Sequence, residues 1–372
     1  MYTNVGCRLR WGMLATLMFT VVSEIAQADD GEAVAVTTDP SASLVDSPWL
    51  IAPVLSSSPK LGTTGGVLAG YLHYFDEKSR PSIFGVTGQY TTTDSIVAGA
   101  FAKTSFDEDR QRVLAGLAYG SIKNDYDDYL GTGIPLKNQA DIKAAVGRYT
   151  YRVKGDWFVG GQGIYQDFAI GGASPFDDQV LDILGIEPYK SAGLGLVVQN
   201  DTRDDDNMPS RGRFFNFNNF VFSESLGGED NYDVYRVELR YFFSHGQRNV
   251  FALRQLNHLT NDAPNAVRAP VQLRGYKVGQ YTAEYMSSIE GEERFRLGER
   301  WTATLFGGVA CLYGDGSSGG GDNCSDTDNL YPAAGAGVQF LLKPKEGIVL
   351  NLEYAQGEGD NYGVYLKMGY GF

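Results

Sequence analysis

The amino-acid sequence predicts an all-β protein, a 16-stranded antiparallel transmembrane β-barrel with an external loop folded into its lumen. Three observations support this prediction. The 372 residues include 47 Gly, 23 Tyr and 20 Phe, an excess of glycine and aromatic residues that is typical of large barrels. Segments that alternate between apolar and polar residues recur along the chain, and each reaches the roughly 9–11 residues that a tilted strand needs to cross a bilayer. Beyond the N-terminal region, the sequence contains no apolar run approaching the ~18 residues of a transmembrane helix.

Residues 1–28 have the layout of a cleaved secretory signal peptide. Arg8 and Arg10 form a charged start, residues 11–22 are apolar, and residues 26–28 read Ala-Gln-Ala, a small-x-small cleavage site. The apolar run is too short to span a bilayer, although a signal anchor stays open as the alternative. We therefore expect an exported protein.

The mature chain is acidic. Residues 29–47 are short and polar, and we expect them to be a disordered periplasmic lead before a barrel over 48–372. The whole chain has 31 basic and 45 acidic residues. Removing Arg8, Arg10 and Glu24 with the signal leaves 29 − 44 = −15. This sign disfavours a nucleic-acid partner, because nucleic-acid binding surfaces are basic.

The alternating segments number sixteen, and a single-chain bacterial barrel prefers an even number. In the last segment, side chains from Tyr362 to Phe372 in steps of two are apolar and should face lipid, whereas Gly363 and Lys367 should face the lumen. The alternative is a soluble β-sandwich with one buried face, but that fold does not require an apolar stripe that ends on the terminal aromatic residue. The predicted strands are 48–56, 63–75, 82–93, 95–106, 111–122, 138–153, 156–169, 188–201, 212–225, 231–245, 248–258, 283–297, 300–313, 330–342, 346–356 and 361–372.

Connection lengths predict the topology. With the N-terminus in the periplasm, the external connections include several long ones, whereas most periplasmic connections are short. Short turns at one end and long loops at the other are the layout of a transmembrane barrel. The exception is 201–211, a long connection on the short side.

The longest of the predicted external loops, 258–282, contains Leu273, Arg274, Gly275 and Tyr276. A loop of this length inside a compact domain is usually functional or disordered. We expect it to fold into the lumen, where a guanidinium must be paired with carboxylates. The inward-facing candidates for a charge network with Arg274 are Glu290, Glu292 and Arg294 on the next strand and Glu238 on another wall. The alternative is a solvated arginine with no lumenal role.

Other motifs are weaker. Cys311 and Cys324 are the two cysteines of the mature chain, and a disulfide and two free thiols are both open. Residues 316–320 match G-x-S-x-G but lie in a glycine–serine run without the strand–turn–helix context of a nucleophile elbow. The three His residues lack metal-ligand spacing. We therefore expect no enzyme activity, no metal site and no cofactor.

From Trp49 to Phe372, the chain resembles the BamA/TamA superfamily of outer-membrane assembly factors, also called the bacterial surface antigen family. The Asp-Thr-Arg-Asp turn at 201–204, followed by a proline and a glycine, is similar to the family's acidic turn. The Leu-Arg-Gly-Tyr stretch at 273–276 is similar to its arginine-glycine-aromatic motif on the sixth external loop. Glu-Glu-Arg-Phe at 292–295 is similar to the strand after that loop.

The sequence departs from the family in two places. The 29–47 lead is too short for the periplasmic POTRA domains of most members, so the resemblance is to a POTRA-less short form. The family's Phe-x-Asp-x-Gly strand motif often supplies an aspartate, but the matching stretch here, 306–310, reads Phe-Gly-Gly-Val-Ala. The departure leaves Arg274 without one usual partner.

The resemblance implies an outer-membrane barrel that assists insertion or translocation of proteins or lipids. The seam between its first and last strands would open laterally toward lipid. Gly363, Gly369 and Gly371 suit a flexible seam, and the alternative is that they provide steric room for the loop that folds into the lumen. Tyr370, Gly371 and Phe372 would form the C-terminal insertion signal. The implied partners are outer-membrane lipids, unfolded outer-membrane or exported client proteins, and a periplasmic partner. The alternatives are a passive pore or structural barrel, and a surface adhesin acting through acidic loops.

Overall fold

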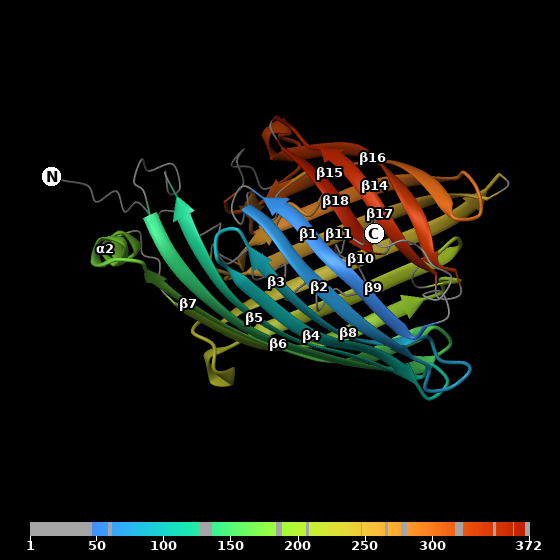
Figure 1. Ribbon diagram of the computed structural model, residues 1–372, viewed down its shortest axis with the longest axis horizontal. Helices are drawn as coiled ribbons and strands as arrows, with labels where there is room; N and C mark the ends of the chain where they lie inside the picture. The colour runs from blue at the N-terminus through green and yellow to red at the C-terminus, as the bar shows by residue number, and fades with distance from the viewer. Residues whose placement is uncertain are drawn as a thin grey trace.

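The computed structural model describes residues 47–58, 62–126, 136–183, 188–205, 208–246, 248–264, 267–276, 281–316, 323–344, 347–359 and 361–368. Within these ranges, sixteen strands form one antiparallel sheet in which each strand pairs with its neighbours along the chain. Figure 1 shows this sheet curled into a barrel with strongly tilted strands. The predicted 16-stranded barrel is confirmed. Its strands are β1 (Trp49–Ser58), β2 (Gly62–His73), β3 (Ser82–Thr91), β4 (Ile96–Phe106), β5 (Gln111–Tyr126), β6 (Leu136–Lys154), β7 (Trp157–Gly172), β8 (Tyr189–Asp201), β9 (Gly212–Phe222), β10 (Tyr232–His245), β11 (Asn249–Asn261), β14 (Tyr285–Arg296), β15 (Trp301–Tyr313), β16 (Leu330–Lys343), β17 (Ile348–Gln356) and β18 (Tyr362–Met368).

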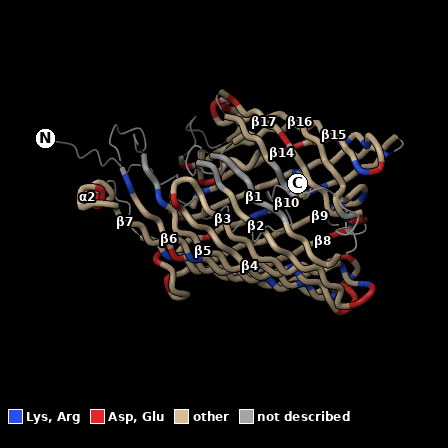
Figure 2. Tube along the Cα trace, viewed as in Figure 1, with Lys and Arg blue, Asp and Glu red and all other residues tan. Residues whose placement is uncertain are grey.

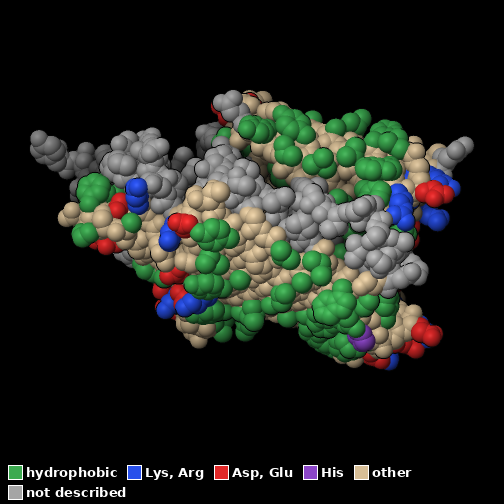
Figure 3. All heavy atoms as spheres, viewed as in Figure 1, with side chains coloured by type: hydrophobic (Ala, Val, Ile, Leu, Met, Phe, Trp, Pro, Cys, Tyr) green, Lys and Arg blue, Asp and Glu red, His purple; other side chains and the backbone are tan. Residues whose placement is uncertain are grey.

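Period-two alternation separates the two faces of the barrel wall, because successive side chains of a strand point to opposite faces. In β10, Arg236, Glu238 and Arg240 are buried on the lumenal side, and Tyr235 and Tyr241 lie on the other face, as predicted. Large apolar side chains are exposed on the outer face of several strands, such as Leu196, Leu305 and Val364. In Figure 3 hydrophobic side chains spread over the outer surface of the strands. This apolar belt suits contact with lipid.

The connections at the two ends of the barrel differ in length. One end, the short-turn end, has the connections 74–81, 107–110, 155–156 and 202–211. The other, the long-loop end, carries the helix α2 (Pro175–Ile183), the short 3-10 helices η3 (Glu224–Leu226) and η5 (Thr327–Asn329), and the strand pair β12 (Ala269–Pro270) and β13 (Thr282–Ala283). Figure 2 shows Lys, Arg, Asp and Glu gathered toward these two ends, with other residue types filling most of the strands. The described helices include none that is both long enough and apolar enough to cross a membrane.

The turn 202–211 is long for the short-turn end, and Asp204 holds it in place. Its carboxylate accepts hydrogen bonds from the backbone N–H groups of Ser210 and Arg211, at 2.8 and 3.0 Å, and from the Ser210 hydroxyl. Partial burial opposes the charged form, but these hydrogen bonds outweigh it and lower the pKa of Asp204. The described parts of the turn, residues 202–205 and 208–211, are therefore held together by hydrogen bonds, and their backbone can serve as a partner for lumenal side chains.

Several strands, among them β5, β6 and β7, extend further than the sequence predicted. β5, β6 and β7 have 16, 19 and 16 residues, and β5 and β6 pair along sixteen positions. The predicted segments 111–122 and 138–153 are therefore too short at the long-loop end. The helix α2 lies beyond the end of β7 and buries Val180 and Leu181. Extra cross-strand pairing lengthens this side of the barrel wall.

Candidate functional site

The connection between β11 and β14, residues 262–284 and here named loop six, enters the lumen. Its Val271, Leu273 and Tyr276 are buried in one apolar cluster with side chains from the barrel wall such as Met286 and Leu312. Within the loop, β12 pairs with β13, and the Val271 N–H donates to the carbonyl of Tyr281 at 3.0 Å. Burial of these apolar side chains fixes the loop beside the inner face of β14 and β15.

Arg274, at the tip of this buried stretch, binds three carboxylates. Its Nε donates to Glu290 Oε1 at 2.8 Å, and its Nη1 donates to Glu292 Oε2 at 2.7 Å and to Glu353 Oε1 at 2.8 Å. The guanidinium also lies over the ring of Phe306, with Cζ 3.4 Å from the ring centroid. Charge-assisted hydrogen bonds and stacking on an aromatic ring are the contacts that a buried guanidinium favours. We call Arg274, Arg294 and the three glutamates the Arg274 network.

Arg294 extends this network toward the short-turn end. Its Nε donates to Glu292 Oε1 at 2.7 Å, and its Nη1 donates to the carbonyl of Pro209 at 3.2 Å. Pro209 belongs to the 202–211 turn that Asp204 orders. The tip of loop six is therefore connected through two arginines and a glutamate to the opposite end of the barrel.

The predicted residues of this network occupy two separate places. Glu290, Glu292 and Arg294 lie around Arg274, whereas Glu238 binds Arg240 at 2.8 Å and Arg254 at 2.6 Å. Both groups face the lumen, and Arg254 lies opposite Glu290 in the β11–β14 ladder. Alternation placed Glu238 on the correct face but did not identify its partners.

Glu353, which was not among the partners predicted for Arg274, supplies the third carboxylate of the network. At Gly308, the position where the family motif has an acidic residue, an added Cβ would lie 2.5 Å from the carbonyl oxygen of Ile289. Glu353 instead reaches Arg274 from β17, and Asn351 Nδ2 holds its Oε1 at 2.7 Å. In the alternation of β17, Glu353 occupies a position that faces the lumen, and this position could have identified it as a partner of Arg274.

Gly275 and Tyr276 attach loop six to the last strands. Gly275 has φ +99°, which favours glycine, and an added Cβ would lie 2.9 Å from the backbone nitrogen of Gly357. Its N–H donates to the hydroxyl of Tyr365 on β18 at 2.8 Å. The Tyr276 hydroxyl donates to the carbonyl of Pro332 at 2.8 Å and accepts from the Glu358 N–H at 2.9 Å.

The predicted glycines of the seam are only partly described. An added Cβ at Gly363 would lie 2.3 Å from the Tyr365 hydroxyl, so this glycine leaves room for the side chain that holds Gly275. Gly369, Tyr370, Gly371 and Phe372 lie outside the described residues. A role of the terminal residues as insertion signal therefore stays a prediction.

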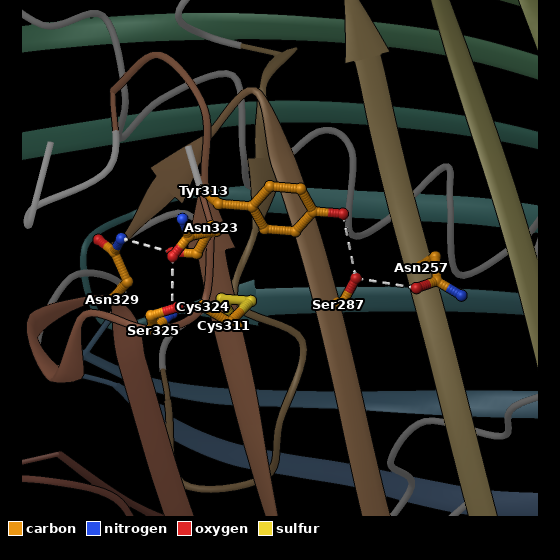
Figure 4. Close-up of a disulfide and its surroundings, with 8 residues drawn as sticks. All are labelled: Asn257, Ser287, Cys311, Tyr313, Asn323, Cys324, Ser325 and Asn329. Carbon is orange, nitrogen blue, oxygen red and sulfur yellow. Dashed lines mark hydrogen bonds between the residues drawn. A yellow bond between two sulfur atoms is a disulfide. The ribbon is translucent and has the colours of Figure 1, made fainter. Parts of the chain in front are cut away.

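A disulfide joins Cys311 and Cys324 at the long-loop end, with the two Cα atoms 5.8 Å apart (Figure 4). Of the two alternatives that the sequence left open, the structure has the bridge. The same loop contacts loop six: Arg268 pairs with the carboxylate of Asp315, and the Glu284 N–H donates to the Asp315 carbonyl at 2.9 Å. In the described part of the chain, no cluster of three or more His, Cys, Asp and Glu side chains could hold a metal ion.

Comparison with known proteins places this geometry in a known fold. No family model and no curated protein matches the sequence. Among solved structures, BamA from Haemophilus ducreyi lacking POTRA domains 1–3 aligns with a TM-score of 0.54 at 13% identity, covering 93% of this chain and 75% of that shortened chain. CdiB from Acinetobacter baumannii gives a TM-score of 0.58 at 10% identity, covering 87% of this chain and 59% of CdiB. CdiB from Escherichia coli gives 0.56 at 11% identity, covering 93% and 68%.

At these identities the likeness concerns the fold. Sixteen antiparallel strands, an apolar outer belt and a loop folded into the lumen agree with the resemblance that the loop motif indicated. The chain spans about three fifths of the length of the Acinetobacter CdiB. This protein therefore has the fold of the BamA and CdiB barrels.

Proposed function

We propose that this protein is an integral outer-membrane barrel that assists the insertion or translocation of proteins or lipids, exported by its signal peptide and without enzyme activity. The single observation that carries the proposal is the Arg274 network. It fixes a loop with an arginine-glycine-aromatic tip to the last strands of the barrel. A plain pore needs no such attachment.

The contacts of the loop tip, residues 273–276, join strands of one wall. Arg274 binds side chains on β14 and β17, Gly275 binds β18, and Tyr276 binds β16. These strands are then held together by the loop as well as by the sheet ladder. The seam would lie between β18 and β1, the two edge strands of the sheet, and β1 and β2 form its other side. The two edges can therefore separate while the loop keeps the C-terminal wall intact.

The orientation and partners are part of the same proposal. Long loops at one end and short turns at the other indicate that the short-turn end faces the periplasm. Outer-membrane lipids would contact the apolar belt. The partners would be unfolded outer-membrane or exported client proteins, together with a periplasmic protein.

The test measures insertion and conductance side by side. The purified full chain is reconstituted into liposomes, and the folding of an unfolded eight-stranded barrel client is followed by its heat-modifiable mobility. We expect faster folding with the wild type, little acceleration with Arg274→Ala, and full acceleration with Arg268→Ala, a loop-six arginine whose partner Asp315 is exposed. A large, steady single-channel conductance without acceleration would instead identify a passive pore. Normal acceleration by a folded Arg274→Ala protein would remove the network from the mechanism.

A further inference from the structure

The outer face of β11 carries a glutamine in the middle of the apolar belt. The strand runs over 13 residues, from Asn249 to Asn261, and Gln255 is its central residue. At about 3.3 Å per residue and a tilt of about 45°, the six residues on either side of Gln255 rise about 14 Å along the membrane normal. Because the apolar band of such a barrel is about 25 Å tall, Gln255 lies near the middle of the band.

The side chain of Gln255 points toward lipid. Its neighbours along the chain, Arg254 and Leu256, face the lumen, where Leu256 is buried with apolar side chains of loop six. In the two adjacent strands, Leu239 and Ile289 lie directly opposite Gln255. Ile289 is 47% exposed on the outer face. A polar amide is therefore placed among apolar side chains on the face that contacts lipid.

Two other amides on this side of the belt have hydrogen-bond partners within the barrel. The side-chain oxygen of Asn219 accepts a hydrogen bond from the Leu196 N–H at 2.9 Å. The side-chain oxygen of Asn257 accepts one from the Ser287 hydroxyl at 2.8 Å (Figure 4). Among the residues that the structure describes, the amide of Gln255 has no hydrogen-bond partner. Its donors and its acceptor are thus available to a neighbour in the membrane.

An amide at this depth is costly if hydrocarbon is its only neighbour, because lipid tails form no hydrogen bonds. Long side chains near the end of a membrane span reach back to the head groups, but Gln255 is too short to do so from the middle of the band. Polar side chains within a membrane form hydrogen bonds across the interface between two protein surfaces. The depth of Gln255 therefore favours a protein partner in the membrane.

A second copy of this chain carries the group that matches. A primary amide has two N–H donors and a carbonyl acceptor, so two facing amides can satisfy each other with a pair of N–H···O bonds. Two barrels in one membrane have the same orientation, and a two-fold axis along the membrane normal brings a residue near the axis opposite itself. Gln255 of one copy would then meet Gln255 of the other at the same depth.

The surface around Gln255 allows a second barrel to approach closely. Leu253 lies opposite Gly291, and Gly291 lies opposite Gly307, all on the outer face. These glycines leave the wall low beside Leu253, and small residues at membrane interfaces permit close contact. Leu253 and Ile289 then supply apolar contacts around the pair of amides.

We propose that this protein forms a two-fold symmetric dimer in the membrane through the outer faces of β10, β11 and β14. The Gln255 amides of the two copies are hydrogen-bonded to each other at the centre of this interface. The seam between β18 and β1 begins five strands along the sheet from β11, so it stays exposed to lipid in each copy. The dimer goes beyond the proposed insertion activity and does not depend on it.

The first test measures self-association of the purified, folded mature chain by sedimentation equilibrium in density-matched detergent micelles. Gln255→Leu removes the amide and keeps a side chain of similar size that suits a lipid-facing position. Val338→Leu is the matched control, because Val338 is an outward residue of β16, is 42% exposed and lies outside the proposed interface. We expect wild type and Val338→Leu to dimerise alike, and Gln255→Leu to have an at least tenfold higher dissociation constant. Heat-modifiable mobility shows that each variant is folded.

The second test locates the interface by crosslinking in liposomes. Leu253→Cys and Val338→Cys each add one thiol to the outer face, while Cys311 and Cys324 are bridged to each other. A membrane-permeant bismaleimide should join two copies of Leu253→Cys, should lose this product when Gln255→Leu is added, and should not join copies of Val338→Cys. A monomeric wild type, an unchanged dissociation constant in Gln255→Leu, or crosslinking through Val338→Cys in place of Leu253→Cys overturns the proposal.

Discussion

Arg274→Ala should release the tip of loop six while the barrel stays folded. The substitution removes a guanidinium that binds Glu290, Glu292 and Glu353 at 2.7–2.8 Å and stacks on Phe306. Three carboxylates then face one another, with Arg294 as the remaining cation of the network. The sheet hydrogen bonds do not pass through Arg274, so the sixteen-strand ladder persists.

The magnitude follows from the burial of the network. Removing one partner of a buried ion pair costs about 3–5 kcal/mol, whereas an exposed pair contributes under ~1 kcal/mol. Arg274 and its three partners are almost fully buried. Apolar contacts of Leu273 and the Tyr276 hydrogen bonds remain, so we take the lower value. About 3 kcal/mol corresponds to a roughly 100-fold larger population of open loop.

Limited proteolysis of loop six in the folded barrel measures this population. Arg274→Ala should be cleaved roughly 100-fold faster, and Arg274→Glu faster still because it adds a fourth carboxylate. The double change Arg274→Glu with Glu292→Arg should restore part of the protection, and Arg268→Ala should behave like the wild type. Equal cleavage of wild type and Arg274→Ala would refute the claim that the network holds the loop.

Three further predictions concern other parts of the molecule. Gly275→Ala should loosen loop six, because the new Cβ would be strained at φ +99° and would contact the backbone of Gly357. Faster proteolysis of the loop with unchanged heat-modifiability of the barrel would show this loosening. An unchanged rate of proteolysis would mean that the backbone shifts at little cost. Cys324→Ser should leave the barrel folded but expose the 314–329 loop to protease, because a disulfide that closes a loop of about 15 residues contributes about 3 kcal/mol of stability. Reduction of the wild type should have the same effect. Resistance of the loop to protease after reduction would show that other contacts hold it. Burial raises the pKa of Asp109, but hydrogen bonds and charge from Arg112 outweigh it and lower the pKa below 3.8. The stability from this carboxylate is thus complete above about pH 4 and lost as pH falls through the lower pKa of the folded state. Thermal unfolding from pH 7 to pH 3 should show a drop only at the acidic end in the wild type and a smaller one in Asp109→Asn, and equal drops would contradict this assignment.

The strands and the two faces of each strand could be predicted from the sequence alone. Period-two alternation is a local property, because each residue reverses the direction of its side chain. It therefore placed Glu238, Glu290 and Glu292 in the lumen and Leu352 and Val364 on the outside before any contact was known. The length of loop six and the arginine of its Leu-Arg-Gly-Tyr stretch then indicated that the loop tip would need these inward carboxylates.

Which inward-facing side chains contact one another depends on the three-dimensional arrangement of all the strands. Arg274 binds Glu353 from 79 residues away, Gly275 binds Tyr365 from 90 residues away, and Arg80 binds Asp201 from 121 residues away. Alternation fixes the face of a side chain, but its height in the barrel depends on the register of every intervening strand pair and on strand tilt. These quantities accumulate around the sheet, so the third partner of Arg274 and the pairing of Arg80 with Asp201 appear only when all sixteen strands are placed together.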